Sequence, residues 1–431
     1  MMTLGIRNGK LYVDGSFHLL NLYFEGERIC AVTEEQLECE NVVDAKGKCI
    51  LPGFIDPHVH FALGVGNCIS KDDFYTGSME GVLGGVTTYI DFLDPVKRAD
   101  EISYEFEKRN KIAEKSVVDY AFHTTIANPT DSPEAIFRAG KEYGINSVKL
   151  FTTYADTDRR TYDGYIFDLL AASKEEGTVV VVHAEHDALI HKDRDILVAD
   201  HEQARPAVTE NIEVMKLGQM AVKTGGNLYL VHVSAGSSVK QLAAVFPKAL
   251  KTGQITLESC PHYFLLNSEY LKREDGYKYT MTPPIRPEEE RLLLREYRDF
   301  ISTIGTDHCP YTLAQKKHRY TSEIPMGIGG IRYSFLNMYQ EYGFSVIDKF
   351  TSGPAAAYAL PKKGKLLPGY DADVVLFDPD GTTVVADPMS VYAGKNLNGK
   401  IEKVFSRGSL VVEDGKVLSH QGRYIRRGEK K

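Results

Sequence analysis

Cysteine is scarce in this sequence, and long apolar runs are absent. Among the 431 residues there are six cysteines, and no two of them form a Cys-X-X-Cys pair. So few cysteines in a long chain favour reduced thiols and a cytoplasmic protein over a disulfide framework. No run of about 18 consecutive apolar residues is present, so we expect no membrane-spanning helix. The N-terminal residues also lack the apolar core of a signal peptide.

Positive charge is also in short supply, because the formal net charge is −8. Proteins that bind nucleic acid usually present a basic surface to the phosphates, so we expect no nucleic-acid partner. One basic segment stands out, at the C-terminus, and we expect it to be a solvated chain end. It comprises Arg423, Arg426, Arg427, Lys430 and Lys431.

Both ends of the sequence have the pattern of short β-strands separated by Asn-Gly, Asp-Gly and other glycine-containing turns. The apolar runs lie at 10–13, 22–24 and 29–32, and again at 373–377, 403–405, 409–412 and 416–418. Two β-rich ends around an α/β middle predict one small β-sandwich domain, built from residues 1–50 and 363–431.

The middle of the chain, residues 51–362, alternates between strand and helix patterns. Eight apolar β-type runs occur, at 53–60, 87–92, 118–126, 147–152, 178–184, 228–234, 254–260 and 302–307. Helical patterns fill most intervals, at 100–115, 132–143, 165–176, 208–224 and 237–249. Eight such units predict a (β/α)8 barrel of the TIM type, with a doubly wound open sheet as the structural alternative.

The first chemical motif is Asp56-Pro57-His58-Val59-His60, at the end of the first predicted barrel strand. Side chains at positions i and i+2 of a strand point to the same side. His58 and His60 can therefore reach one metal ion from one strand end. Alone, the pair is weak evidence for a metal site, because most such histidines serve packing or surface roles.

Further polar residues lie at the ends of later predicted strands. His183 ends Val-Val-Val-Val-His, His232 ends Leu-Tyr-Leu-Val-His, and Asp307 lies in Ile-Gly-Thr-Asp-His. Each of them alone could be an ordinary polar side chain whose hydrogen bonds are made within the fold and which binds no ligand. A parallel barrel, however, brings the C-terminal ends of all its strands to one face, where active sites form. We therefore expect these side chains to meet.

Lys149 lies inside the apolar segment Ser-Val-Lys-Leu-Phe. A buried, unpaired ammonium group is costly, so this lysine must be neutralised, paired or modified. One solution is carboxylation by CO2, which produces a carbamate whose two oxygens can bridge two metal ions. The sequence leaves these possibilities open.

In order and strand position these residues resemble the metal ligands of the amidohydrolase superfamily, and the similarity spans essentially the whole chain. The most similar branch is that of the hydantoinases and dihydropyrimidinases, which are cyclic amidases, with allantoinases and dihydroorotases as relatives. Matching segments include Asp72-Asp73-Phe74-Tyr75-Thr76-Gly77, Thr282-Pro283-Pro284-Ile285-Arg286 and Asp307-His308-Cys309-Pro310 with Gln315-Lys316.

The resemblance implies a two-metal centre that hydrolyses the ring of a small cyclic ureide by attack of a hydroxide shared between the metals. His58 and His60 would hold one metal with Asp307, His183 and His232 would hold the other, and carboxylated Lys149 would bridge them. Zinc suits these ligands, with manganese or cobalt as alternatives. Asp307 would also be the proton shuttle.

The resemblance assigns substrate contacts too. Tyr154 would donate to the reacting carbonyl oxygen, and backbone groups near Thr282 and Met326 would hold the ureide. Met326 stands where hydantoinases often have Asn. Ala62 stands where dihydroorotases carry an arginine that binds a substrate carboxylate, so an uncharged ring is favoured over dihydroorotate.

Other classes on the same barrel remain as alternatives. They are an allantoinase or dihydroorotase type of cyclic amidase, a non-catalytic dihydropyrimidinase-like scaffold protein, and a mononuclear deaminase. The scaffold is disfavoured because every ligand type is retained, and the deaminase because a single metal needs no bridging lysine. The resemblance also implies a homo-oligomer, either a dimer or a tetramer.

Overall fold

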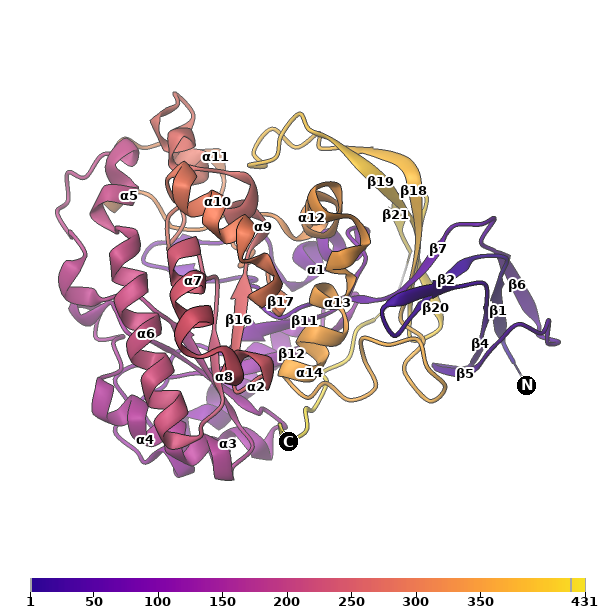
Figure 1. Ribbon diagram of the computed structural model, residues 1–431, viewed down its shortest axis with the longest axis horizontal. Helices are drawn as coiled ribbons and strands as arrows, with labels where there is room; N and C mark the ends of the chain where they lie inside the picture. Colours follow the sequence, from indigo (N-terminus) through magenta and orange to yellow (C-terminus); the bar gives the residue numbers. More distant parts are fainter. Residues whose placement is uncertain (1, 419–420, 431) are drawn as a thin grey trace.

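Eight parallel strands form a barrel in the middle of the chain (Figure 1). The computed structural model describes residues 2–418 and 421–430. The barrel strands are β8 (Phe54–Asp56), β11 (Val86–Phe92), β12 (Asp119–Thr125), β13 (Ser147–Phe151), β14 (Val179–His183), β15 (Leu228–Leu230), β16 (Ile255–Ser259) and β17 (Thr303–Ile304). Each pairs in parallel with the next. A parallel bridge between Val59 and His308 joins the first strand to the last and closes the ring. The prediction of a (β/α)8 barrel is confirmed.

The apolar composition of these strands follows from burial on both faces. In β14, Val180 and Val182 pack in the large cluster that also contains helix residues. Val179 and Val181 instead belong to a second cluster, which includes Ile55 and other residues of the remaining strands. Successive side chains of a strand point to opposite faces, so an uninterrupted valine run fills the barrel interior and the helix layer at once.

The helices of the described chain are α1 (Phe74–Leu83), α2 (Ile102–Ala113), α3 (Pro133–Glu142), α4 (Asp163–Glu175), α5 (His201–Ala204), α6 (Ala207–Thr224), α7 (Gly236–Val245), α8 (Pro247–Lys251), α9 (Pro261–Leu265), α10 (Glu288–Glu296), α11 (Leu313–Lys316), α12 (Ser334–Tyr342), α13 (Ile347–Phe350) and α14 (Ser352–Ala357). The five predicted helical segments are found, as α2, α3, α4, α6 and the pair α7–α8, and the structure adds further helices that the patterns did not predict. The segment 237–249, predicted as one helix, is divided, because Pro247 cannot continue α7 and instead begins α8. In the described part of the chain, none of the helices is long and apolar enough to cross a membrane.

Strands from both chain ends build a β domain beside the barrel (Figure 1). One sheet has the order β5-β4-β1-β6 and the other the order β21-β20-β19-β18-β7-β2-β3. In the second sheet, β7 (Cys49–Pro52) pairs with β18 (Val374–Val384), which joins the two ends of the sequence. Apolar side chains of both sheets, among them Ile6, Leu22, Ile50 and Phe405, form one core between them. The remaining strands are β1 (Leu4–Arg7), β2 (Lys10–Val13), β3 (Ser16–His18), β4 (Asn21–Glu25), β5 (Arg28–Thr33), β6 (Asn41–Asp44), β19 (Asn396–Ser406), β20 (Ser409–Glu413) and β21 (Lys416–Val417).

The backbone of the basic tail is hydrogen-bonded to the barrel as far as Lys430, so the expectation of a solvated chain end was wrong for these residues, and Lys431 lies outside the described residues. The backbone N–H of Tyr120 on β12 donates to the carbonyl of Arg423 at 2.9 Å, and the N–H of Ile425 donates back to Tyr120 at 2.7 Å. Arg427 is only 6% exposed and donates to the hydroxyl of Ser147 at 2.9 Å. Charge alone cannot reveal this burial, because the acceptors come from barrel strands far away in the sequence.

A buried ion cluster joins the barrel to the β domain. The ammonium of Lys363 lies 2.7 Å from Asp119 of β12, 2.9 Å from Asp371 and 2.6 Å from Asp373. Arg407, at the end of β19, also contacts Asp119, at 3.0 Å. The three carboxylates lie close enough together to resemble a metal site, but the ammonium of Lys363 already contacts all three of them.

We predict that Lys363→Met lowers the free energy of unfolding by about 3–5 kcal/mol, because the change removes the cation that Asp119, Asp371 and Asp373 share. Of their ion pairs in the described part of the chain, only those of Arg407 with Asp119 and of Arg28 with Asp371 would remain. The shift of the denaturant midpoint measures the loss. Lys365→Met is the control, since Lys365 is 44% exposed and lies 3.8 Å from Asp14, and exposed pairs contribute only about 0–1 kcal/mol. Equal shifts for the two variants would contradict the prediction.

Candidate functional site

A cavity of about 720 Å³ opens at the C-terminal ends of the barrel strands. This volume suits a small-molecule substrate. All nine residues that the sequence predicted for the site line this cavity, namely His58, His60, Lys149, Tyr154, His183, His232, Thr282, Asp307 and Met326. Leu63 and Val65, beside the hairpin of β9 (Gly64–Val65) and β10 (Cys68–Ile69), line it as well.

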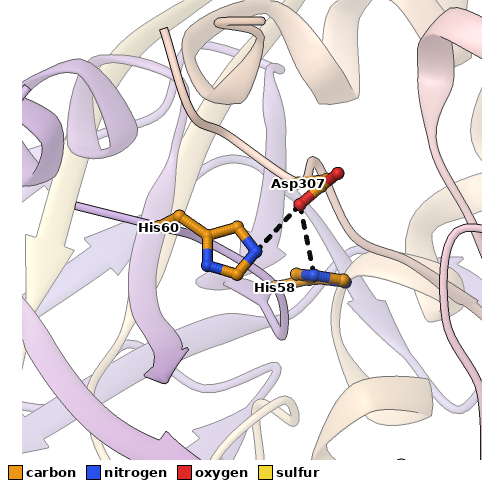
Figure 2. A group of neighbouring side chains, drawn as sticks. All are labelled: His58, His60 and Asp307. Carbon is orange, nitrogen blue, oxygen red and sulfur yellow. Dashed lines mark ion pairs between the residues drawn. The ribbon is translucent and has the colours of Figure 1, made fainter. Parts of the chain in front are cut away.

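His58, His60 and Asp307 form the first group of potential ligands (Figure 2). One carboxylate oxygen of Asp307 lies 3.2 Å from Nε2 of His58 and 3.0 Å from Nε2 of His60. Nδ1 of His58 is engaged by Glu258 at 2.8 Å, which turns Nε2 toward Asp307. Although an Asp307 oxygen lies 3.2 Å away, this buried Nε2 forms no hydrogen bond within the described residues. An unpartnered ring nitrogen beside a carboxylate fits a metal ligand.

Electrostatics in this group favour a charged aspartate. Burial would raise the pKa of Asp307, but the imidazoles of His58 and His60 hold it well below its usual range. Burial lowers the pKa of His58, and the carboxylates of Glu258 and Asp307 outweigh that effect and raise it to about 9. The same negative charges that favour a proton on His58 would favour a metal cation in its place.

His183 and His232 form the second group. Nδ1 of His183 faces Nε2 of His232 at 3.0 Å. The other ring nitrogen of His183 contacts the buried carboxylate of Glu185 at 2.6 Å, and Glu185 is held by two contacts to Arg205, at 2.6 and 3.1 Å. A carboxylate behind a histidine fixes the ring and its tautomer, an arrangement common at metal sites. The rings of His58 and His232 are 5.4 Å apart between centroids, so the two groups adjoin.

Lys149 lies on β13 with only 2% of its surface exposed. Its ammonium is 5.4 Å from the ring centroids of both Phe92 and Phe151. No carboxylate or carbonyl within residues 2–418 and 421–430 forms a hydrogen bond with it. Burial lowers the pKa of Lys149 to about 8, against the opposing pull of Asp307 and Glu258. The lowered pKa gives this amine a larger neutral fraction near physiological pH than an exposed lysine has, and the neutral amine is the form that attacks CO2.

Tyr154 follows β13 and faces the second group, with its ring centroid 5.5 Å from that of His183. The guanidinium of Arg205 lies 5.4 Å from the same tyrosine ring. Burial raises the pKa of Tyr154 to about 12, against the opposing effects of Arg205 and Thr282. The phenol therefore stays protonated at neutral pH and can donate a hydrogen bond into the cavity.

Several residues at the cavity have a backbone conformation that L-residues rarely adopt. The φ angles are +48° at Ala62, +67° at Tyr154, +39° at His232 and +51° at Asp307. Left-handed backbone at non-glycine residues is costly and clusters at functional sites. It explains why β15 and β17 end before His232 and Asp307, although the apolar pattern had predicted strands that included both residues.

Sequence reasoning missed the residues behind the potential ligands. It assigned no role to Glu185, Glu258 or Arg205. Glu258 is completely buried within the strand Ile255–Ser259, and it could have been found by the argument that was applied to Lys149. Glu185 follows His183 by two positions, and its role depends on Arg205, whose approach the sequence does not indicate.

The chain matches known proteins over almost its full length. The sequence model of the Amidohydrolase family matches residues 49–411. A D-hydantoinase of Geobacillus stearothermophilus is 30% identical, over 99% of this chain and 97% of the relative. A D-phenylhydantoinase of Escherichia coli is also 30% identical, over 91% of this chain and 90% of the relative.

Solved structures give the same result. A crystal structure of a D-hydantoinase superposes with a TM-score of 0.91 at 27% identity and covers 100% of both chains. The structure of a dihydropyrimidinase from Brevibacillus agri superposes with a TM-score of 0.89 at 26% identity, over 100% of this chain and 99% of that one.

The contact between Glu185 and His183 generates a prediction about metal affinity. We expect Glu185→Gln to weaken the binding of Zn²⁺ by about 10–100-fold, because the carboxylate that orients the ring is lost. Titration of metal-free protein against a chelator measures this affinity. Glu213→Gln is the matched control, since Glu213 is also buried and contacts the ring of His186, at 2.7 Å, but His186 does not line the cavity. Unchanged affinity in Glu185→Gln would refute the assignment.

Proposed function

The chain belongs to the amidohydrolase family, and on that premise we propose that it is a metal-dependent cyclic amidase. Its substrate would be a small cyclic ureide, of the hydantoin or 5,6-dihydropyrimidine type, and the reaction would hydrolyse one ring C–N bond. The observation that carries the proposal is the convergence of four histidines, one aspartate and one buried lysine on a single cavity. The hydantoinases and dihydropyrimidinase that resemble the chain support the substrate class.

We further propose that the site takes two divalent metal ions, zinc in the first instance and manganese or cobalt as alternatives. His58, His60 and Asp307 would hold one ion, and His183 and His232 the other. The nitrogen and carboxylate donors suit zinc. When bound, the ions supply Lewis acidity and lower the pKa of water so that it can attack near neutral pH.

In this proposal Lys149 is carboxylated and bridges the two ions. The support is its burial without a hydrogen-bonding partner in the described residues, together with the lowered pKa of its amine. Reaction of the neutral amine with CO2 forms a new N–C bond and releases one proton. The resulting carbamate replaces a buried cation with an anion, which is the charge that a site for two divalent ions requires.

The protein's own groups would divide the remaining work. Asp307, whose pKa is held low, would accept a proton as the attacking oxygen bonds to the ring carbonyl carbon. It would then deliver that proton to the ring nitrogen as the C–N bond breaks, so that the product is an open ureido acid. The phenol of Tyr154 would donate a hydrogen bond to the oxygen that gains negative charge in the transition state.

The rest of the cavity would hold and select the substrate. Backbone groups at Thr282 and Met326 would bind the ureide, and the apolar side chains of Leu63 and Val65 would contact a substituent on the ring. Ala62 supplies no cation for a substrate carboxylate. The charged dihydroorotate would therefore give up hydration without gaining a cation at this position.

A cytoplasmic location and a homo-oligomeric state complete the proposal. All six cysteines are free thiols, which supports a reducing compartment. On α4 and α6, Phe167, Val208, Ile212 and Val222 are each at least 38% exposed. Such an apolar surface on adjacent helices supports a dimer or a tetramer.

We predict that metal-loaded protein hydrolyses an uncharged ureide with a higher kcat/KM than dihydroorotate. The reason is the desolvation of an unpaired carboxylate in a cavity where Ala62 offers no cation. The test is a panel of hydantoin, 5-substituted hydantoins, dihydrouracil, allantoin and dihydroorotate, with chelator-treated protein as the control. The highest kcat/KM for dihydroorotate would refute the branch assignment, and no turnover of any ring would refute the function.

We also predict that Lys149 carries a carboxylate in metal-loaded protein. Protein loaded with metal in the presence of ¹³C-bicarbonate should give a carbamate carbon signal in its NMR spectrum. Lys149→Met should lack the signal and hold less metal. Lys316→Met, which removes a different buried amine of the same region, should keep the signal. Two bound metals without a carbamate signal would contradict the prediction.

A further inference from the structure

The side chain of Lys316, at the end of α11, is 2% exposed and lies behind the wall of the cavity. Its ammonium group donates to the carbonyl of Thr280 at 2.7 Å and to the hydroxyl of Thr280 at 2.6 Å. It also contacts the carbonyls of Pro325, at 3.2 Å, and Gly327, at 3.0 Å. The ammonium of Lys316 therefore joins two segments, one at Thr280 and the other at residues 325–327, which are more than 40 residues apart in the sequence.

These two segments carry two of the proposed substrate contacts. Thr282 follows the first segment by two positions, and Met326 lies within the second. In the described part of the chain, the one other hydrogen bond between the segments runs from the N–H of Gly327 to the carbonyl of Thr280, at 3.1 Å. Most of the polar connection between these parts of the wall thus passes through the Lys316 ammonium.

Lys316 itself is held in place by its helix. The hydroxyl of Thr312 caps α11 by accepting from the N–H of Gln315. The side-chain amide of Gln315 donates to the carbonyl of Ile69 at 3.1 Å, near the β9–β10 hairpin. The anchor of the lysine is therefore fixed independently of the two segments to which it binds.

Burial of an ammonium is costly unless its protons are used. Burial lowers the pKa of Lys316 to about 7. Three of the four contacted oxygens are carbonyls, which can only accept, so each of them stabilises the protonated amine. Hydrogen bonds to a charged donor are short and directional, so they fix the separation of the two segments more sharply than apolar packing would.

We infer that Lys316 is a positioning residue for substrate binding, which sets the separation between the segment that leads to Thr282 and the segment 325–327. The inference rests on the proposed function for its effect on the substrate. The connection between the segments exists in the ligand-free protein and can be tested there.

The first test compares Lys316→Met with Lys349→Met. Lys349 also donates to two backbone carbonyls, those of Arg298 and Ile301, but neither of these residues lines the cavity, whereas Pro325 and Gly327 do. With the best ring of the ureide panel, Lys316→Met should raise KM on the order of 10-fold, as expected for lost hydrogen bonds. Its kcat should change less, and its metal content should stay equal to that of the parent protein. Lys349→Met should leave KM unchanged.

The second test needs no substrate. Hydrogen exchange of the Gly327 amide, which donates to Thr280, should become faster in Lys316→Met and stay unchanged in Lys349→Met. Thr280→Val removes the hydroxyl that accepts from Lys316 and donates to the carbonyl of Tyr277, and it keeps the Thr280 carbonyl. It should raise KM in the same direction by a smaller factor, and it serves as well if Lys316→Met does not fold.

The outcomes separate the two proposals. Faster exchange at Gly327 in a protein that turns over no ureide would support the connection and refute the proposed function. Unchanged exchange, or an equal rise of KM in Lys316→Met and Lys349→Met, would overturn the role of Lys316 while leaving the function intact.

Discussion

The buried carboxylate of Glu258 fixes two candidate metal ligands at once, and the rest of the site depends on it. One oxygen accepts from Nδ1 of His58 at 2.8 Å and from the backbone N–H of His232 at 3.2 Å. The other oxygen accepts from the hydroxyl of Tyr229 at 2.8 Å. A carboxylate at this depth would be costly without such donors. The need to hydrogen-bond this carboxylate therefore fixes the positions of His58, His232 and Tyr229, although Glu258 itself does not line the cavity.

The same principle recurs on the other side of the site, where Glu185 holds His183 and is itself held by Arg205. Each group of potential ligands thus has its own buried carboxylate behind it. The negative charge of these two residues and of Asp307 makes the cavity attractive to cations. Lys149 adds a buried amine that faces the same space. This charge balance connects the positioning of the ligands to the chemistry that we propose.

The barrel and the residues around its cavity could be predicted from the local pattern of apolar runs and from the rule that the C-terminal ends of parallel barrel strands meet at one face. The eight apolar runs gave the strands, and parallel closure brought the strand ends together. The carboxylates behind the ligands were missed because their roles depend on contacts between distant segments, as for Arg205 with Glu185. The early ends of β15 and β17 were also missed, since the apolar pattern does not reveal left-handed backbone at His232 and Asp307. The division of the helix at Pro247, by contrast, could have been predicted from the proline alone.

The pairing of β7 with β18 has a consequence for synthesis of the chain. The strand Cys49–Pro52 is made more than 300 residues before its partner, Val374–Val384. The tail that pairs with Tyr120 of β12 is made later still. Neither the second sheet nor this edge of the barrel can be completed on a partly synthesised chain. Until their partners are made, β7 and β12 keep unpaired backbone groups, and unpaired strands are prone to aggregation. The nascent chain is therefore exposed to aggregation until these later segments have been made.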